Sequence, residues 1–144
     1  MIEIFIFHMV VTWFMTGLIW FIQVVHYPLF ARVGKNHYEM YQTSHMRLTT
    51  WVVGPPMVIE ALTGVALLFV VLKGIPPVLV WANLGLLGMI WISTVLWQVP
   101  QHNTLLNGFN AVAHQRLIRS NWVRTFAWTV RALLLSGFLL VVLG

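Results

Sequence analysis

Residues Ile4 to Val25 form the stretch IFIFHMVVTWFMTGLIWFIQVV, in which only His8 and Gln23 are strongly polar. A helix that crosses the hydrocarbon core of a bilayer needs about 20 mostly apolar residues, so this stretch predicts a membrane-spanning helix. Three more stretches have the same character, and they cover residues 56–72, 78–99 and 122–143. We therefore expect an all-α fold, a four-transmembrane-helix bundle that forms a single integral membrane domain over residues 1–144.

The composition supports this fold class. Hydrophobic residues make up 60% of the chain and charged residues only 8%, whereas a soluble domain has about 45–50% and about 25%. These values exclude an ordinary soluble domain, and the high hydrophobicity excludes a disordered chain. The net charge of +5 fits the positive-inside bias of membrane proteins, so we expect no nucleic-acid partner. The absence of cysteine excludes disulfides and thiolate metal sites.

The positions of Lys and Arg predict the orientation. Six of them follow the first and third predicted helices: Arg32, Lys35, Arg47, Arg116, Arg119 and Arg124. The opposite side carries only Lys73, in the tight turn that ends at Pro77. We expect a multi-pass protein of the inner (plasma) membrane, with both termini outside and both long connections in the cytoplasm. Residues at helical spacing predict short helical extensions in these connections, over 36–51 and 110–121.

The two halves of the chain, residues 1–75 and 76–144, resemble each other. The first predicted helix ends in Gln23-Val-Val-His26, and the third ends in Gln98-Val-Pro-Gln-His102. The later matches are His45 with His114, Trp51 with Trp122, and Glu60 with Arg131. Because the first and third helices cross in the same direction, we expect two parallel two-helix repeats that gather the histidines at one membrane face.

Glu60 and Arg131 are expected near the middle of the bilayer, where an ionisable side chain needs a partner inside the bundle. One interpretation is a structural ion pair between the second and fourth helices. The other makes Glu60 a metal ligand or proton carrier, with Arg131 holding a substrate oxygen. Both residues are therefore candidates for a catalytic role.

The histidines suggest a cofactor. Imidazole and carboxylate ligands suit redox metals, so the candidate ligands of iron, copper or a haem are His26, His45, His102, His114 and Glu60. The alternative is a set of solvated histidines at the interface, and His8 and His37 are expected to lie outside any site. Candidates for cofactor binding or for orienting the ligands are Gln23, Gln98, Asn103, Asn121 and Arg124. Tyr41 is a catalytic candidate that would line a pocket for an aromatic substrate, or else belongs to an interfacial aromatic belt.

The second half resembles the anthrone-oxygenase-like family of small four-helix membrane proteins. The matching stretches are VPQHNTL at residues 99–105 and NWVRT at 121–125, and Pro28 with LFAR after it is similar to the family's end of the first helix. The resemblance implies an oxidoreductase linked to the oxygenation of phenolic anthrones to quinones. It also implies that Pro100, Asn103, Asn121 and Arg124 are pocket or packing positions. In that family the position of His102 is commonly Asn, and His26 has no usual counterpart.

Together these patterns favour an integral membrane oxidoreductase. Its most specific form is a metal- or haem-dependent oxygenase that acts on a lipophilic phenolic or quinone-like substrate near the cytoplasmic face. One alternative is a non-enzymatic accessory or structural subunit of a larger membrane complex. Another is a proton-coupled carrier that uses Glu60. The lipid bilayer is an expected partner in each case, whether the chain is a homo-oligomer or a subunit.

Overall fold

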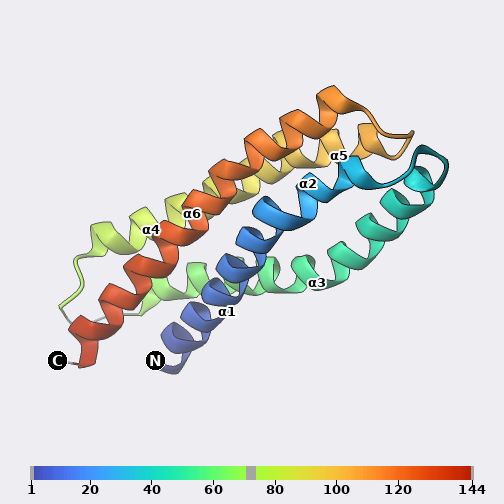
Figure 1. Ribbon diagram of the computed structural model, residues 1–144. Helices are drawn as coiled ribbons and strands as arrows, with labels where there is room; N and C mark the ends of the chain where they lie inside the picture. Colours follow the sequence, from blue (N-terminus) through green and yellow to red (C-terminus); the bar gives the residue numbers. More distant parts are fainter. Residues whose placement is uncertain (1, 71–73, 144) are drawn as a thin grey trace.

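A computed structural model describes residues 2–70 and 74–143, and within them the chain forms four long helical segments and no strand (Figure 1). The first segment contains α1 (Ile2–Phe21), the π turn η1 (Ile22–His26), α2 (Tyr27–Leu29) and the short turn η2 (Phe30–Arg32). The second contains η3 (Lys35–His37), α3 (Tyr38–Ala66) and η4 (Leu67–Phe69). The third contains α4 (Pro77–Ser93), the π turn η5 (Thr94–Gln98) and α5 (Val99–Leu105), and the fourth is α6 (Ala111–Leu143). The expected all-α four-helix bundle is confirmed.

The four segments are 29 to 35 residues long and apolar enough to cross a membrane. At about 1.5 Å per residue, 29 residues extend about 44 Å, which exceeds the hydrocarbon thickness of about 30 Å. Each segment is therefore longer than the length needed to cross that layer. The helical extensions expected over 36–51 and 110–121 are confirmed, since α3 begins at Tyr38, directly after η3, and α6 begins at Ala111, and both continue without interruption into the apolar stretches. Of the expected tight turn, Lys73 lies outside the described residues, and Gly74 has the positive φ of 79° that favours glycine.

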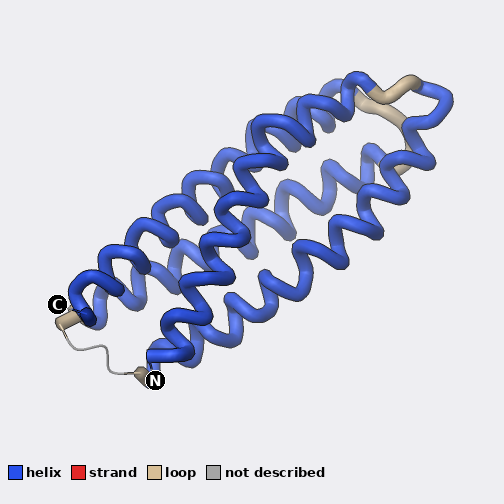
Figure 2. The backbone as a smooth tube through the Cα atoms, turned by 60° about the horizontal axis from the view of Figure 1, so that its bottom comes forward, coloured by secondary structure: helices blue, strands red, loops and turns tan. Residues whose placement is uncertain are grey.

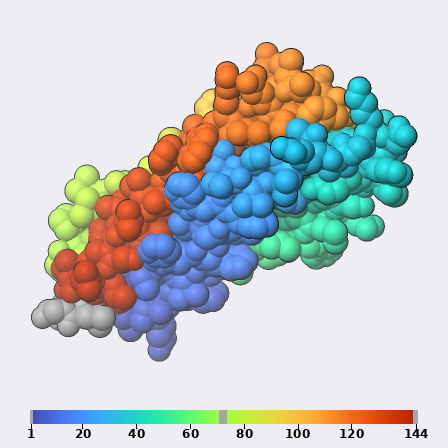
Figure 3. All heavy atoms as spheres, viewed as in Figure 1, coloured from blue at the N-terminus to red at the C-terminus, as the bar shows by residue number. Residues whose placement is uncertain are grey.

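The helices alternate in direction. The beginning of α1 and the end of α6 lie at one end of the bundle, and the connections at residues 33–34 and 106–110 lie at the other (Figures 1 and 2). The helix α6 packs against both α1 and α4, and α1 also packs against α3. The result is an elongated body in which α1 and α6 lie side by side on one face (Figure 3). Many large apolar side chains are exposed, as expected for helices that face lipid.

A π turn interrupts the first and the third segments at related places. The Tyr27 N–H donates to the Ile22 carbonyl, and the Val99 N–H donates to the Thr94 carbonyl. The next residue is Pro28 in one case and Pro100 in the other. Proline lacks an N–H, and its ring clashes with the carbonyl four residues earlier in a regular helix. The wider turn lets each segment continue past its proline. This shared feature supports the two-repeat interpretation, which stays a prediction.

The helix α3 continues through Gly54, Pro55 and Pro56. Figure 1 shows this helix bending along its length. The two prolines remove the N–H groups that would bond the carbonyls four residues earlier. The bend separates the part of α3 that carries His45 from the part that carries Glu60.

Candidate functional site

A buried ion pair joins the second and fourth segments. The Arg131 Nη1 lies 2.6 Å from Glu60 Oε1, and both side chains are fully buried. The same carboxylate accepts hydrogen bonds from Thr12 Oγ1 at 2.7 Å and from Trp128 Nε1 at 2.9 Å. A buried charge is stable only when it is paired and hydrogen-bonded. The geometry therefore supports the structural ion pair between Glu60 and Arg131.

The remaining donors of Arg131 reach the other two segments. Its Nε donates to Asn83 Oδ1 at 3.3 Å, and its Nη2 lies 3.2 Å from His8 Nε2. Because a guanidinium only donates, His8 Nε2 must accept, and the His8 proton sits on Nδ1. That Nδ1 lies 2.7 Å from Thr63 Oγ1. We expected His8 to lie outside any site, and the structure instead buries it fully against Arg131.

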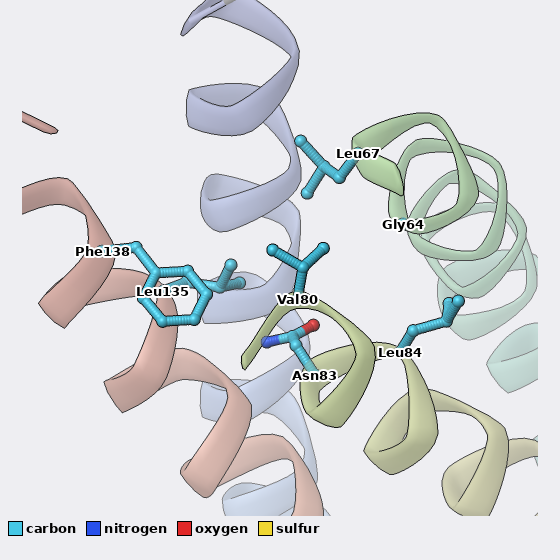
Figure 4. A pocket seen from close by; sticks show the side chains of 7 residues that line it. All are labelled: Gly64, Leu67, Val80, Asn83, Leu84, Leu135 and Phe138. Atoms are coloured by element: carbon cyan, nitrogen blue, oxygen red, sulfur yellow. The ribbon is translucent and has the colours of Figure 1, made fainter. Parts of the chain in front are cut away.

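A small cavity borders this network. Its volume is about 10 Å³, and Asn83 is its most polar lining residue among apolar neighbours such as Leu135 and Phe138 (Figure 4). A space of this size accommodates about one water molecule. The cavity is therefore too small for an organic substrate. The network acts as a cross-link of all four segments and not as a binding pocket.

The four histidines predicted as metal ligands gather at the end of the bundle that holds the connections at residues 33–34 and 106–110. We call this end the histidine end. The His26 Nε2 lies 2.9 Å from His45 Nδ1, and the ring centroids of His45 and His102 are 5.3 Å apart. The ring of Phe30 lies among them, 4.9 Å from His45 and 6.2 Å from His114 between centroids. The expectation that four histidines meet at one end is therefore borne out by these contacts.

Two of these histidines are fixed by internal hydrogen bonds. The Gln42 Nε2 donates to His102 Nδ1 at 3.0 Å, so the other His102 nitrogen carries the proton and donates to the Tyr27 hydroxyl, also at 3.0 Å. The His114 Nε2 lies 2.7 Å from the Tyr27 carbonyl and donates to it. Both nitrogens of His102 are thus occupied, and it offers no free lone pair.

The five predicted metal ligands do not form one site. Glu60 and His45 are fifteen residues apart on the continuous helix α3, which corresponds to about 22 Å at about 1.5 Å per residue. Within residues 2–70 and 74–143, no group of three or more His, Cys, Asp or Glu is placed to hold a metal ion. The grouping of Glu60 with the histidines is therefore wrong, because Glu60 is committed to Arg131 at a different depth of the bundle.

The predicted orienting residues connect helices more than they orient imidazoles. The Asn121 Nδ2 donates to Gln23 Oε1 at 2.9 Å, and the Gln23 Nε2 donates to the Ile118 carbonyl at 3.2 Å. The Gln98 Nε2 donates to Ser120 Oγ at 3.1 Å. Each of these bonds joins a π turn to α6. The widened turns are therefore held in place by amide side chains.

The other candidates have different surroundings. Arg124 is buried with its guanidinium carbon 5.2 Å from the centroid of the Trp128 ring. Tyr41 stacks on His45 with centroids 6.4 Å apart and an interplanar angle of 12°. Asn103 is exposed and lies outside the cluster. Tyr41 thus remains a candidate for a catalytic role near the histidine end, and Arg124 remains a candidate for binding a cofactor there. Asn103 is no longer a candidate for that role.

An open cavity of about 210 Å³ lies between the first and second segments beside His26. Its lining residues are Leu18, Phe21, Ile22, His26, Leu48, Thr49, Val52 and Val53. His26 and Thr49 are the two polar residues among these eight. The cavity therefore gives an apolar molecule access to one imidazole of the His26–His45 pair.

The two polar clusters are the network around Glu60 and Arg131 and the group of histidines at the histidine end. Several of their residues were not expected from the sequence. His8, Thr12 and Thr16 follow each other at intervals of four and form a buried polar row on α1, which is a signal that helical spacing could have revealed. Tyr27 and Gln42 gave no such signal, because their roles depend on the position of His102.

Comparisons with known families, with curated proteins and with solved structures find no match to this chain. The resemblance to the anthrone-oxygenase-like family stays a prediction.

Proposed function

We propose that this protein is an integral membrane oxidoreductase, an oxygenase, whose lipophilic phenolic or quinone-like substrate reaches His26 from the bilayer. The observation that carries the proposal is the apolar cavity of about 210 Å³ with His26 in its wall and His45 2.9 Å behind it. The cavity is large enough for an aromatic ring, since an apolar cavity of about 150 Å³ binds benzene. Small-molecule sites are typically apolar with a few polar groups, as this cavity is.

The imidazole pair supplies acid–base chemistry. When His26 donates its Nε2 proton to His45 Nδ1, the His26 Nδ1 keeps a free lone pair and can accept a proton. The second imidazole orients the first, which is the arrangement of a general base held by a partner. Tyr41 also stacks on the His45 ring.

The proposed reaction is the oxygenation of an anthrone-type ring with dioxygen as the oxidant. His26 accepts one proton from the ring methylene, and the remaining carbanion is delocalised across the central ring onto the oxygen of the ring ketone. This carbon then bonds to one oxygen of O₂, and the O–O bond breaks as the second C–H proton is lost. Overall, the CH₂ group and O₂ become a C=O group and water. Two C–H bonds break, one carbon–oxygen double bond forms, and the second oxygen leaves with both protons. Within the described residues, no group of three or more His, Cys, Asp or Glu is placed to hold a metal ion, and the reaction is proposed without the iron, copper or haem expected from the sequence.

The histidine end is proposed to face the cytoplasm in the inner membrane. Six Lys and Arg lie in the parts of the sequence that follow the first and third predicted helices, whereas the connection between the second and third contains only Lys73, and this asymmetry favours that orientation. Substrate would then enter laterally from the lipid near the cytoplasmic interface.

The test uses the purified full chain in phosphatidylcholine vesicles with anthrone as substrate. Dioxygen uptake and quinone absorbance are measured for the wild type, His26→Ala and His37→Ala. The loss of a general base lowers rates by about 10²–10⁴-fold, so His26→Ala is expected to fall in this range. His37 is exposed and serves as the matched control. A wild type no faster than empty vesicles, or a His26→Ala variant with the wild-type rate, would overturn the proposal.

A second variant tests the cavity itself. Val52→Trp fills the cavity from its exposed wall. It is expected to raise KM, because less room remains for the substrate, while His26 and His45 are unchanged. An unchanged KM would place the substrate elsewhere.

The accessory-subunit function is the second candidate. The observation that favours it is the internal hydrogen bonding of both ring nitrogens of His102 and of His114 Nε2, which stabilises the bundle without a ligand. Stable co-purification with partner proteins, together with an unaffected His26→Ala variant in the cell, would favour it over the oxygenase.

A further inference from the structure

A second open cavity lies between the third segment and the beginning of α6, at the histidine end. It has a volume of about 470 Å³, and its lining residues are Trp97, Gln101, Arg116, Arg119, Ser120 and Val123. These side chains come from η5, α5 and the beginning of α6. The cavity is more than twice as large as the one beside His26 and is the more basic of the two.

The two arginines of this cavity have no acidic partner. Both are exposed. The chain contains only three acids, Glu3, Glu39 and Glu60. Among the described residues the one salt bridge is that between Glu60 and Arg131. The cavity therefore presents two unpaired guanidinium groups, one helical turn apart on α6.

The depth of the cavity matches the lipid headgroups. Trp97 and Trp122 are partly exposed, and exposed tryptophans typically lie at the membrane interface. Arg119 precedes Trp122 by three residues and Arg116 precedes it by six, which corresponds to about 4.5 and 9 Å along the helix. The headgroup layer on each side is about 5–7 Å thick. Measured from Trp122, Arg119 therefore falls within the thickness of the headgroup layer and Arg116 about 2–4 Å beyond it, whereas Val123 lies on the other side of Trp122.

We propose that this cavity binds an anionic phospholipid. The guanidinium groups of Arg116 and Arg119 contact the headgroup phosphate, and one acyl chain lies against Trp97 and Val123. Arginine binds phosphate through paired, charge-assisted hydrogen bonds, and basic pockets between membrane helices bind anionic headgroups. Gln101 adds an amide donor at the rim. This site is independent of the chemistry proposed for His26.

The contribution of the charges can be stated as a fold-change. A basic residue near an anionic surface contributes about fivefold in binding, so the pair is expected to contribute about thirtyfold. Native mass spectrometry of the detergent-purified full chain, titrated with phosphatidylglycerol, measures this directly. The double variant Arg116→Gln/Arg119→Gln is expected to weaken phosphatidylglycerol binding about thirtyfold. Arg47→Gln, an exposed arginine on α3, is the matched control and is expected to leave binding unchanged.

Two further arms separate a lipid site from other phosphate chemistry. Phosphatidylcholine is expected to bind no better to the wild type than to the double variant, because its headgroup has no net charge. Inorganic phosphate is expected not to displace phosphatidylglycerol, since it lacks the acyl chain that contacts Trp97 and Val123. Equal binding of phosphatidylglycerol by the wild type and the double variant, equal loss in Arg47→Gln, or displacement by inorganic phosphate would overturn the proposal. The substituted side chains are exposed, and helical circular dichroism spectra verify that the variants fold.

Discussion

The Glu60–Arg131 ion pair predicts that losing one partner destabilises the bundle about as much as losing both. In Arg131→Met the carboxylate stays buried with only Thr12 and Trp128 as donors. In Glu60→Gln the guanidinium stays buried without a counter-charge and keeps its contacts to Asn83 and His8. The double variant leaves neither charge behind.

The magnitude follows from the burial of both side chains. Removing one partner of a buried ion pair costs about 3–5 kcal/mol, mainly because the other charge is left uncompensated. Two independent losses would therefore add up to about 6–10 kcal/mol. Replacing both partners by neutral groups removes that penalty, so we expect Glu60→Gln/Arg131→Met to cost no more than about 3–5 kcal/mol. The interaction energy of the cycle is then about 3–5 kcal/mol, at or above the upper end for residues in contact.

Reversible unfolding in mixed micelles measures the free energy of unfolding for the four proteins of this cycle. A control cycle uses Trp13→Phe and Ser136→Ala, which break the exposed hydrogen bond from Trp13 Nε1 to Ser136 Oγ at 3.1 Å. Such bonds between membrane helices contribute about 0.6 kcal/mol on average. If the losses of the Glu60 and Arg131 variants add within about 0.5 kcal/mol, the two groups do not depend on each other and the reasoning is refuted.

Three other predictions concern the histidine end. Tyr27→Phe removes the acceptor of the buried His102 N–H and is expected to destabilise the fold by about 1–3 kcal/mol in the same assay, whereas no change would contradict the assigned hydrogen bond. Asn110→Ala removes the side-chain oxygen that accepts the Ala113 N–H at the start of α6. A loss of about 0.5–2 kcal/mol is expected, and an unchanged melting temperature would argue against this cap. An optical spectrum with elemental analysis of the purified protein tests the predicted redox metal or haem. The sequence-based expectation is bound iron, copper or haem, and a protein without any of them whose melting is unaffected by chelators would exclude it.

The helical bundle could be predicted because its signal is local. The length of each apolar stretch sets the number of spanning helices, and only a helix satisfies the backbone of a single segment in lipid. Glu60 follows Trp51 by nine residues, and Arg131 follows Trp122 by nine residues. The sequence therefore predicted that both side chains lie at the same depth in the membrane. Their contact at 2.6 Å agrees with that count.

The composition of the two polar clusters could not be predicted in the same way. The sequence placed Glu60 with the histidines by residue type alone, although α3 separates Glu60 from His45 by about 22 Å at about 1.5 Å per residue. His8 was assigned to no site because its partner, Arg131, is 123 residues away in the chain. Neither error concerns the secondary structure.

The sequence by itself therefore determined the four apolar helices, their alternating direction and the end at which the histidines gather. Only the tertiary structure decided which polar side chains meet, where the π turns widen the first and third segments, and which histidine faces a cavity. The physical reason is the range of the interactions. Helix formation and lipid burial depend on consecutive residues, whereas a hydrogen-bonded cluster depends on the rotation and depth of several helices at once, which are set by packing across the whole bundle.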